Sequence, residues 1–184
     1  MRIYMAGPLG FSEAGLRFHD EVLLELVRRL GHEPLDPWTL TAPAKLAAIR
    51  AMPWGTRRRA AWAKLDMEIG ATNRFAIDRA DAVLAVLDGA DVDSGAAAEI
   101  GYAFALGKPI VGYRGDWRIC SDNEGSTVNL QVEYFIRQSG GSIVTRVKDI
   151  ARALRQLPKT PGAKRKILTH HRGGEVAEKR LDTK

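Results

Sequence analysis

Several hallmarks of other protein classes are scarce or missing in this chain of 184 residues. Its one cysteine, Cys120, excludes an intrachain disulfide framework and a zinc site made of cysteines alone. No apolar run approaches the ~20 residues that a membrane-spanning helix needs, and the N-terminus lacks the long apolar region of a secretory signal. There is no Gly-x-x-x-x-Gly-Lys phosphate loop, and Gly7-Pro8-Leu9-Gly10 does not match a dinucleotide fingerprint, so ATP and NAD chemistry lack support. These absences favour a cytoplasmic enzyme or binding domain.

The positive charge is concentrated near the C-terminus. A net charge of +6, from 28 Lys and Arg against 22 Asp and Glu, would by itself suggest a nucleic-acid partner. Residues 158–184 hold eight of those basic and three of those acidic side chains, so residues 1–157 carry only +1. We therefore expect one domain over residues 1–157, a basic and mobile tail over residues 158–184, and no nucleic-acid partner.

Strand-like and helix-like segments alternate along the domain. Residues 82–87 are apolar on both faces, as a central parallel strand requires. The alternation predicts an α/β fold, a doubly wound sheet of about five parallel strands flanked by helices. Ligands bind such sheets at the carboxyl ends of the strands, which places residues 6–11, 36–38 and 88–99 on one rim. The predicted strands are 3–6, 32–35, 82–87, 109–113 and 142–145, and the predicted helices are 12–30, 43–51, 57–79, 95–106, 128–137 and 147–157.

One carboxylate does not fit the helix that contains it. Glu99 is the only charged residue in residues 96–106, and a helix that is apolar on all sides is expected to be buried. An ionised carboxylate there costs several kcal/mol unless it is paired or hydrogen-bonded. Its head could instead reach the helix N-terminus, or the helix could be misassigned and Glu99 exposed. We favour a functional carboxylate, because such groups are enriched in active sites.

Three more acidic residues, Asp88, Asp91 and Asp93, lie just before this helix. Asp93 is well placed to be the helix N-cap, and three carboxylates on one loop are also suited to Mg²⁺. A pair of carboxylates of which one is buried suits glycosyl transfer, in which one acid attacks the anomeric carbon while another group protonates the leaving group.

The chain resembles the nucleoside 2-deoxyribosyltransferase family over most of residues 3–130. The block from Asp93 to Ala103 is the most specific part of the match. The matching segments are Ile3-Tyr4-Met5-Ala6-Gly7-Pro8-Leu9, Asn73-Arg74-Phe75-Ala76-Ile77-Asp78-Arg79-Ala80-Asp81-Ala82-Val83, Asp93-Ser94-Gly95-Ala96-Ala97-Ala98-Glu99-Ile100-Gly101-Tyr102-Ala103, Leu106-Gly107-Lys108-Pro109 and Val128-Asn129-Leu130. The resemblance implies a flavodoxin-like fold and transfer of 2-deoxyribose between nucleobases through a covalent glycosyl-enzyme.

The resemblance also implies roles for particular residues. The nucleophile corresponds to Glu99, and the tyrosine that orients it corresponds to Tyr4. The acid that contacts the base corresponds to Asp93. Asn129 corresponds to an asparagine that binds the sugar 5′-hydroxyl in the active site of a neighbouring subunit. Read without the resemblance, Tyr4 would be a strand aromatic and Asn129 a helix-start residue. The partners implied are 2′-deoxynucleosides and free nucleobases, in a homo-oligomer with shared active sites and without a cofactor, metal or membrane.

Further residues are expected to line the substrate site. The loop through Gly7 and Leu9 can bring backbone close to a ligand, and Phe11 and Trp38 are candidates for stacking on the base, although packing is their commoner role. Asn73 stands where some family members have an aspartate that helps to protonate the base, so Asp93 or a water must supply that proton here. Ala96 and Ala98 replace bulkier residues, which leaves the base preference open.

Two other functions share the expected fold. One is hydrolysis of nucleosides or nucleoside 5′-monophosphates, for which Arg57-Arg58-Arg59 is a candidate phosphate-binding cluster, unless it is a solvated helix face. The other is a non-catalytic nucleotide-sensing module, since fold does not determine function. The presence of both Glu99 and Asp93 argues against a sensor, which needs no nucleophile.

Overall fold

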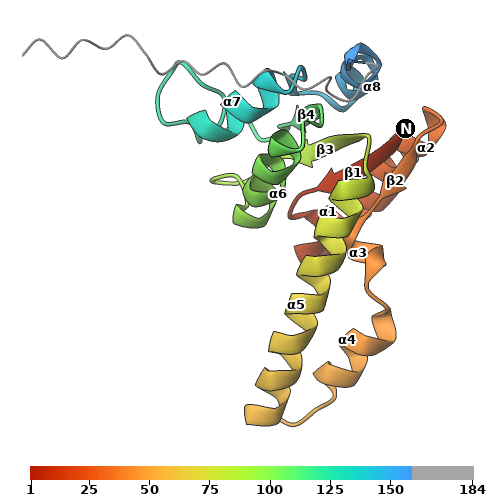
Figure 1. Cartoon of the computed structure of the whole chain (residues 1–184). Coiled ribbons are helices and arrows are strands. Elements are labelled where there is room, and N and C mark those ends of the chain that lie inside the picture. Colours follow the sequence, from red (N-terminus) through yellow and green to blue (C-terminus); the bar gives the residue numbers. More distant parts are fainter. Residues whose placement is uncertain (159–184) are drawn as a thin grey trace, which may run out of the picture.

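A computed structural model describes residues 1–158 and shows a five-stranded sheet in which all strands are parallel (Figure 1). The spatial order is β2-β1-β3-β4-β5, which confirms the predicted doubly wound, flavodoxin-like fold. The strands are β1 (Arg2–Ala6), β2 (Glu33–Leu35), β3 (Ala82–Val86), β4 (Ile110–Tyr113) and β5 (Ile143–Val144). The tail predicted from residue 158 lies, apart from its first residue, outside the described residues.

The strand order reverses at β1, which pairs with β2 on one side and with β3 on the other. Tyr4 lies between Leu35 and Val83 in the register of these pairs. The carboxyl ends of β1, β2 and β3 therefore meet at one edge of the sheet. This reversal point is where doubly wound sheets bind ligands, so the topology marks the edge where the site is expected.

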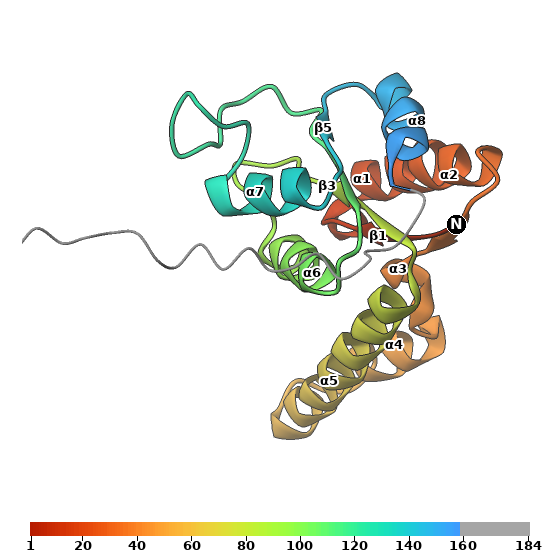
Figure 2. The same ribbon diagram turned by 45° about the horizontal axis from the view of Figure 1, so that its top comes forward.

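Helices cover both faces of the sheet (Figure 2). One face packs mainly against α1 (Glu13–Phe18), η2 (His19–Leu24), α2 (Glu25–Arg29) and α8 (Val147–Gln156), the other against α6 (Ser94–Ala105), α7 (Leu130–Gln138) and the end of α5 (Thr56–Arg79). The predicted helix over residues 12–30 is confirmed, but its middle, η2, is a π-helix, which the apolar spacing did not indicate. Single π-helical turns are rare and often lie near functional sites.

Part of the chain projects from the sheet. After the short helix α3 (Pro37–Leu40), the helix α4 (Pro43–Arg50) and the first half of α5 form a hairpin that extends away from the body in both views (Figures 1 and 2). Of the 24 residues in α5, only Leu65, Ala76 and Ile77 are buried. Residues 36–38, which the sequence places on the ligand-binding rim, include the start of α3, where Asp36 caps the helical turn that begins at Pro37. In the described part of the chain, no helix is long and apolar enough to span a membrane.

Candidate active site

A phenol and a carboxylate meet at the reversal point of the sheet. Tyr4 on β1 is fully buried, and its hydroxyl donates a hydrogen bond of 2.6 Å to Oε1 of Glu99 on α6. The two residues are 95 positions apart in the sequence. Burial, followed by the charges of Glu99 and Asp36, raises the pKa of Tyr4 well above its usual value, so the phenol stays protonated and remains a donor.

Helical spacing directs Glu99 toward the sheet. Ala96, Ile100 and Ala103 form the buried face of α6, and Glu99 lies beside them, three residues after Ala96 and four before Ala103. The small alanines let the helix pack closely on β1 and β3. The expectation of a helix buried on all sides is wrong, because Ala98 and Ala105 are exposed. Only the sheet-facing side is apolar and buried, and Glu99 lies at its margin.

Burial raises the pKa of Glu99 from its usual value of 4.5 to about 6. The hydrogen bond from Tyr4 opposes this shift, the charge of Asp93 adds to it, and the Asn73 side chain lowers the pKa again. The hydrogen bond from the phenol, and the role of Asp93 as cap, argue against the alternative that the Glu99 head serves the helix N-terminus. Glu99 is therefore a half-buried carboxylate that is ionised at neutral pH and held by a neutral donor.

Asp93 caps the helix that carries Glu99. Its Oδ2 accepts a hydrogen bond of 2.9 Å from the backbone N–H of Ala96, as its sequence position predicts. The neighbouring acids are held locally, since Asp91 accepts from the N–H of Val92 and Asp88 from the N–H of Asp116. Within residues 1–158, no group of three His, Cys, Asp or Glu side chains lies close enough together to hold a metal ion.

Asn73 on α5 reaches Glu99 from a third element. A hydrogen bond from its side-chain amide lowers the pKa of Glu99, and its Oδ1 is buried without a hydrogen-bond partner. An amide cannot supply a mobile proton, but it can donate a hydrogen bond to a carboxylate or a sugar hydroxyl. The structure thus brings Tyr4, Asn73, Asp93 and Glu99 together from β1, α5 and α6.

The loop after β1 lies at the same edge of the sheet as Tyr4 and Glu99. Gly7 has φ +148°, and a Cβ there would lie 2.8 Å from the Cβ of Val86, so only glycine lets β1 and β3 end side by side. Leu9 begins a short 3₁₀ turn, η1 (Leu9–Phe11). The Phe11 ring is 77% exposed and meets the Trp38 ring edge-on, with 4.8 Å between centroids. Exposure leaves Phe11 a candidate for stacking on a base.

A buried polar pair holds the loop after β2, and sequence reasoning missed it. His19, in the π-helix, lies 3.0 Å from Oδ1 of Asp36, and both side chains are almost fully buried. The same oxygen accepts from the N–H of Trp38, while Oδ2 is buried without a partner. The Asp-Pro pair at the start of α3 is a recognisable cap signal, whereas His19 carries no local signal of this contact.

Two other predicted groups lie apart from Glu99. Asn129 is the N-cap of α7, where its Oδ1 accepts from Gln131 and Val132, and it makes no hydrogen bond to Tyr4 or Glu99 of its own chain. The arginines at residues 57–59 begin α5, at the far end of the projecting hairpin (Figure 1), so the candidate phosphate cluster is not at this edge within one chain.

Comparisons with known proteins agree with this architecture. A family model described as nucleoside 2-deoxyribosyltransferase matches residues 3–131. The uncharacterized protein C191.05c of Schizosaccharomyces pombe is 25% identical over 201 aligned residues, which cover 83% of this chain and 89% of that protein. A conserved protein from Enterococcus faecalis V583 has a similar structure, with a TM-score of 0.61, 25% identity, and coverage of 85% of this chain and 98% of that chain. A 2-deoxyribosyltransferase from Bacillus psychrosaccharolyticus shares the fold, with a TM-score of 0.57, 23% identity, and coverage of 88% and 99%.

Proposed function

Because this chain belongs to the nucleoside 2-deoxyribosyltransferase family, we propose that it transfers 2-deoxyribose between nucleobases through a covalent glycosyl-Glu99 intermediate. The observation that carries the proposal is the 2.6 Å hydrogen bond between Tyr4 and Glu99 at the reversal point of the sheet. A nucleophilic carboxylate must be ionised, oriented and shielded from water. A pKa of about 6, a neutral phenol donor and half-burial meet these three conditions.

In the first step, a Glu99 oxygen forms a bond to C1′ of the deoxynucleoside while the bond from C1′ to the base nitrogen breaks. Tyr4 holds Oε1, which leaves Oε2 to attack. Asp93, directly or through a water, takes up a proton from solvent and passes it to the departing base. The transition state resembles an oxocarbenium ion, which the adjacent negative charge stabilises. Deoxyribose lacks the 2′-hydroxyl that would disfavour such a cation, which fits a preference for deoxynucleosides.

In the second step, the incoming base attacks C1′, loses a proton to Asp93, and displaces the Glu99 carboxylate. Two displacements at one carbon give net retention and ping-pong kinetics. In the proposal Asn73 orients the Glu99 carboxylate by a hydrogen bond. Gly7, Leu9 and Phe11 line the part of the site that holds the base.

We further propose a homo-oligomer in which Asn129 binds the sugar 5′-hydroxyl in a neighbouring active site. The cap geometry supports this role, because Oδ1 is committed to the start of α7 and the amide N–H₂ is left as a donor. Sedimentation of the purified chain should show at least a dimer. Asn129→Ala should then raise KM for the deoxynucleoside.

Base exchange tests the central proposal directly. A deoxynucleoside is incubated with and without a second free base, and the products are separated by chromatography. A new deoxynucleoside that appears only with the acceptor supports transfer, free deoxyribose without the acceptor indicates hydrolysis, and binding without turnover indicates a sensing module. Glu99→Ala should abolish exchange with the fold intact, and a trapped deoxyribosyl adduct should map to Glu99. Near-wild-type exchange in that variant would refute the assignment.

A further inference from the structure

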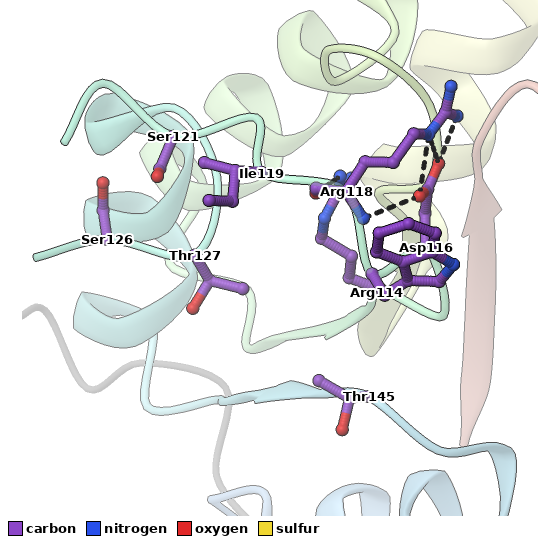
Figure 3. Close-up of a pocket in the computed structure, with 9 residues that line it drawn as sticks. Arg114, Asp116, Arg118, Ile119, Ser121, Ser126, Thr127 and Thr145 are labelled. Carbon is purple, nitrogen blue, oxygen red and sulfur yellow. Dashed lines mark hydrogen bonds and ion pairs between the residues drawn. The ribbon is translucent and has the colours of Figure 1, made fainter. Parts of the chain in front are cut away.

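A separate pocket lies where β4 and β5 end. It has a volume of about 250 Å³, and none of its lining residues belongs to the Tyr4–Glu99 site (Figure 3). The lining residues are Arg114, Asp116, Trp117, Arg118, Ile119, Ser121, Ser126, Thr127 and Thr145. We call it the Arg114 pocket. Sites for drug-sized ligands usually measure ~300–1,000 Å³, so this volume suits a small polar group with part of a sugar.

Arg114 is a buried cation whose hydrogen bonds all go to backbone carbonyl oxygens. Its side chain is among the few charged groups that are almost fully buried, at 3% exposure. Nη1 donates to the carbonyl oxygen of Leu87, and Nη2 donates to those of Gly89 and Arg118, at 2.5, 3.2 and 2.7 Å. All three acceptors are neutral, so no carboxylate hydrogen-bonds to this guanidinium in residues 1–158. Two of its five N–H groups remain for a ligand.

Asp116 and Asp88, which lie in the same region, already accept other hydrogen bonds. Asp116 pairs with Arg118, whose Nε lies 3.0 Å from both of its carboxylate oxygens, and this ion pair holds the pKa of Asp116 well below its usual range (Figure 3). Asp88 accepts the backbone N–H of Asp116. The three charged side chains that line the pocket, Arg114, Arg118 and Asp116, leave it with one net positive charge.

Hydroxyl groups and apolar surface complete the pocket. Ser126, Thr127 and Thr145 line it, and the Ser126 hydroxyl oxygen is buried without any hydrogen-bond partner. A buried polar atom of this kind is costly unless something binds it. The side chains of Trp117 and Ile119 also line the pocket and are 91% and 88% exposed. A ligand here therefore meets a cation that no carboxylate hydrogen-bonds, several hydroxyl donors and an exposed aromatic ring.

We propose that the Arg114 pocket binds the phosphate group of a nucleoside 5′-monophosphate. Guanidinium and hydroxyl donors are the groups that proteins use for phosphate oxygens, and a phosphate would place negative charge beside the buried cation of Arg114. The exposed Trp117 ring offers a stacking surface for the base. This site goes beyond the proposed transfer reaction, since it shares no residue with the Tyr4–Glu99 site.

Equilibrium dialysis of labelled deoxyadenosine 5′-monophosphate tests the proposal. The full chain is used with Glu99→Ala, which prevents turnover, and with excess unlabelled deoxyadenosine, which occupies the Tyr4–Glu99 site. Binding should persist under these conditions and should be displaced by unlabelled deoxyadenosine 5′-monophosphate. The result does not depend on base exchange by the native protein, so failure of this proposal and failure of the proposed function are distinguishable.

Variants assign any binding to the pocket. Arg114→Gln and Ser126→Ala should each weaken it, the first by about tenfold or more, and Thr145→Glu should abolish it by placing a negative charge at the pocket wall. If Arg114→Gln fails to fold because the hydrogen bonds to backbone carbonyl oxygens are lost, the other two variants still test whether the ligand binds in this pocket. Arg146→Gln is the matched control, because Arg146 is an exposed arginine next to Thr145 that pairs with Asp149 outside the pocket.

Several results would overturn the proposal. They are the absence of binding, binding that excess deoxyadenosine removes, and binding that neither Ser126→Ala nor Thr145→Glu changes. Competition by inorganic phosphate shows whether the pocket recognises a phosphate group alone or the phosphate of a nucleotide. If it competes as well as the nucleotide does, the pocket binds phosphate alone and the nucleotide assignment is wrong. If it competes at least about tenfold less well, sugar or base contacts contribute as proposed.

Discussion

Removing the phenol of Tyr4 should shift the pH dependence of base exchange. Below pH 6 most Glu99 carboxyl groups carry a proton and cannot attack C1′, so the rate should rise as pH passes through about 6. Tyr4→Phe removes the 2.6 Å hydrogen bond that stabilises the ionised form. The pKa of Glu99 must then increase, and the acid limb must move to higher pH.

The size of the shift follows from the hydrogen bond. A hydrogen bond to a charged group contributes about 1.5–3 kcal/mol, and about 1.4 kcal/mol corresponds to one pKa unit. The acid limb of kcat/KM should therefore move upward by about one to two pH units. Activity should be lost mainly at neutral pH and partly recovered near pH 9.

The assay is the initial rate of base exchange between pH 4.5 and 9, measured by chromatography. Tyr102→Phe is a matched control, because it removes another 2.6 Å phenol–carboxylate bond, from Tyr102 on α6 to Asp78. That variant should leave the acid limb in place. An unchanged limb in Tyr4→Phe, with a uniform loss of rate, would show that Tyr4 does not control the ionisation of Glu99.

Three further predictions concern stability. The carboxyl group of Glu99 loses its proton near pH 4.5 when unfolded and near pH 6 when folded, so its burial penalises the native state above pH 6. Glu99→Gln should therefore raise the free energy of unfolding by up to ~2 kcal/mol at pH 8, and the gain should vanish below pH 4.5 in urea denaturation. Gly10→Ala should cost about 1–3 kcal/mol of stability, because the new Cβ would lie 2.2 Å from the Trp38 ring. Gly70→Ala, on open helix surface, should instead stabilise the protein by about 0.5–1 kcal/mol. Equal urea-unfolding midpoints for the two variants would contradict the packing argument. His19→Ala leaves its buried carboxylate partner short of a donor and should cost about 1–3 kcal/mol, which thermal unfolding would detect.

Local chemistry explains why much of the fold could be predicted. The apolar run at residues 82–87 and the helical spacing at 57–79 are properties of neighbouring residues, and both elements form near their predicted ends. The Asp93 cap is also a short-range signal, since its bond to Ala96 spans three residues. The π-helix at His19 was missed, because its backbone pattern leaves no mark in apolar periodicity.

The sequence alone determined the order of strands and helices, the family, and the one acid that stands out among the apolar residues of its helix. These follow from periodicity, capping and motif spacing, which act over a few residues. Tertiary structure decided which groups meet, because contacts between distant elements depend on sheet order and register. Tyr4 bonds to Glu99, which lies 95 positions further along the sequence. Asp36, the cap of α3, bonds to His19 in the π-helix η2. Arg114 likewise bonds to the carbonyl oxygen of Leu87 only because β4 lies beside β3.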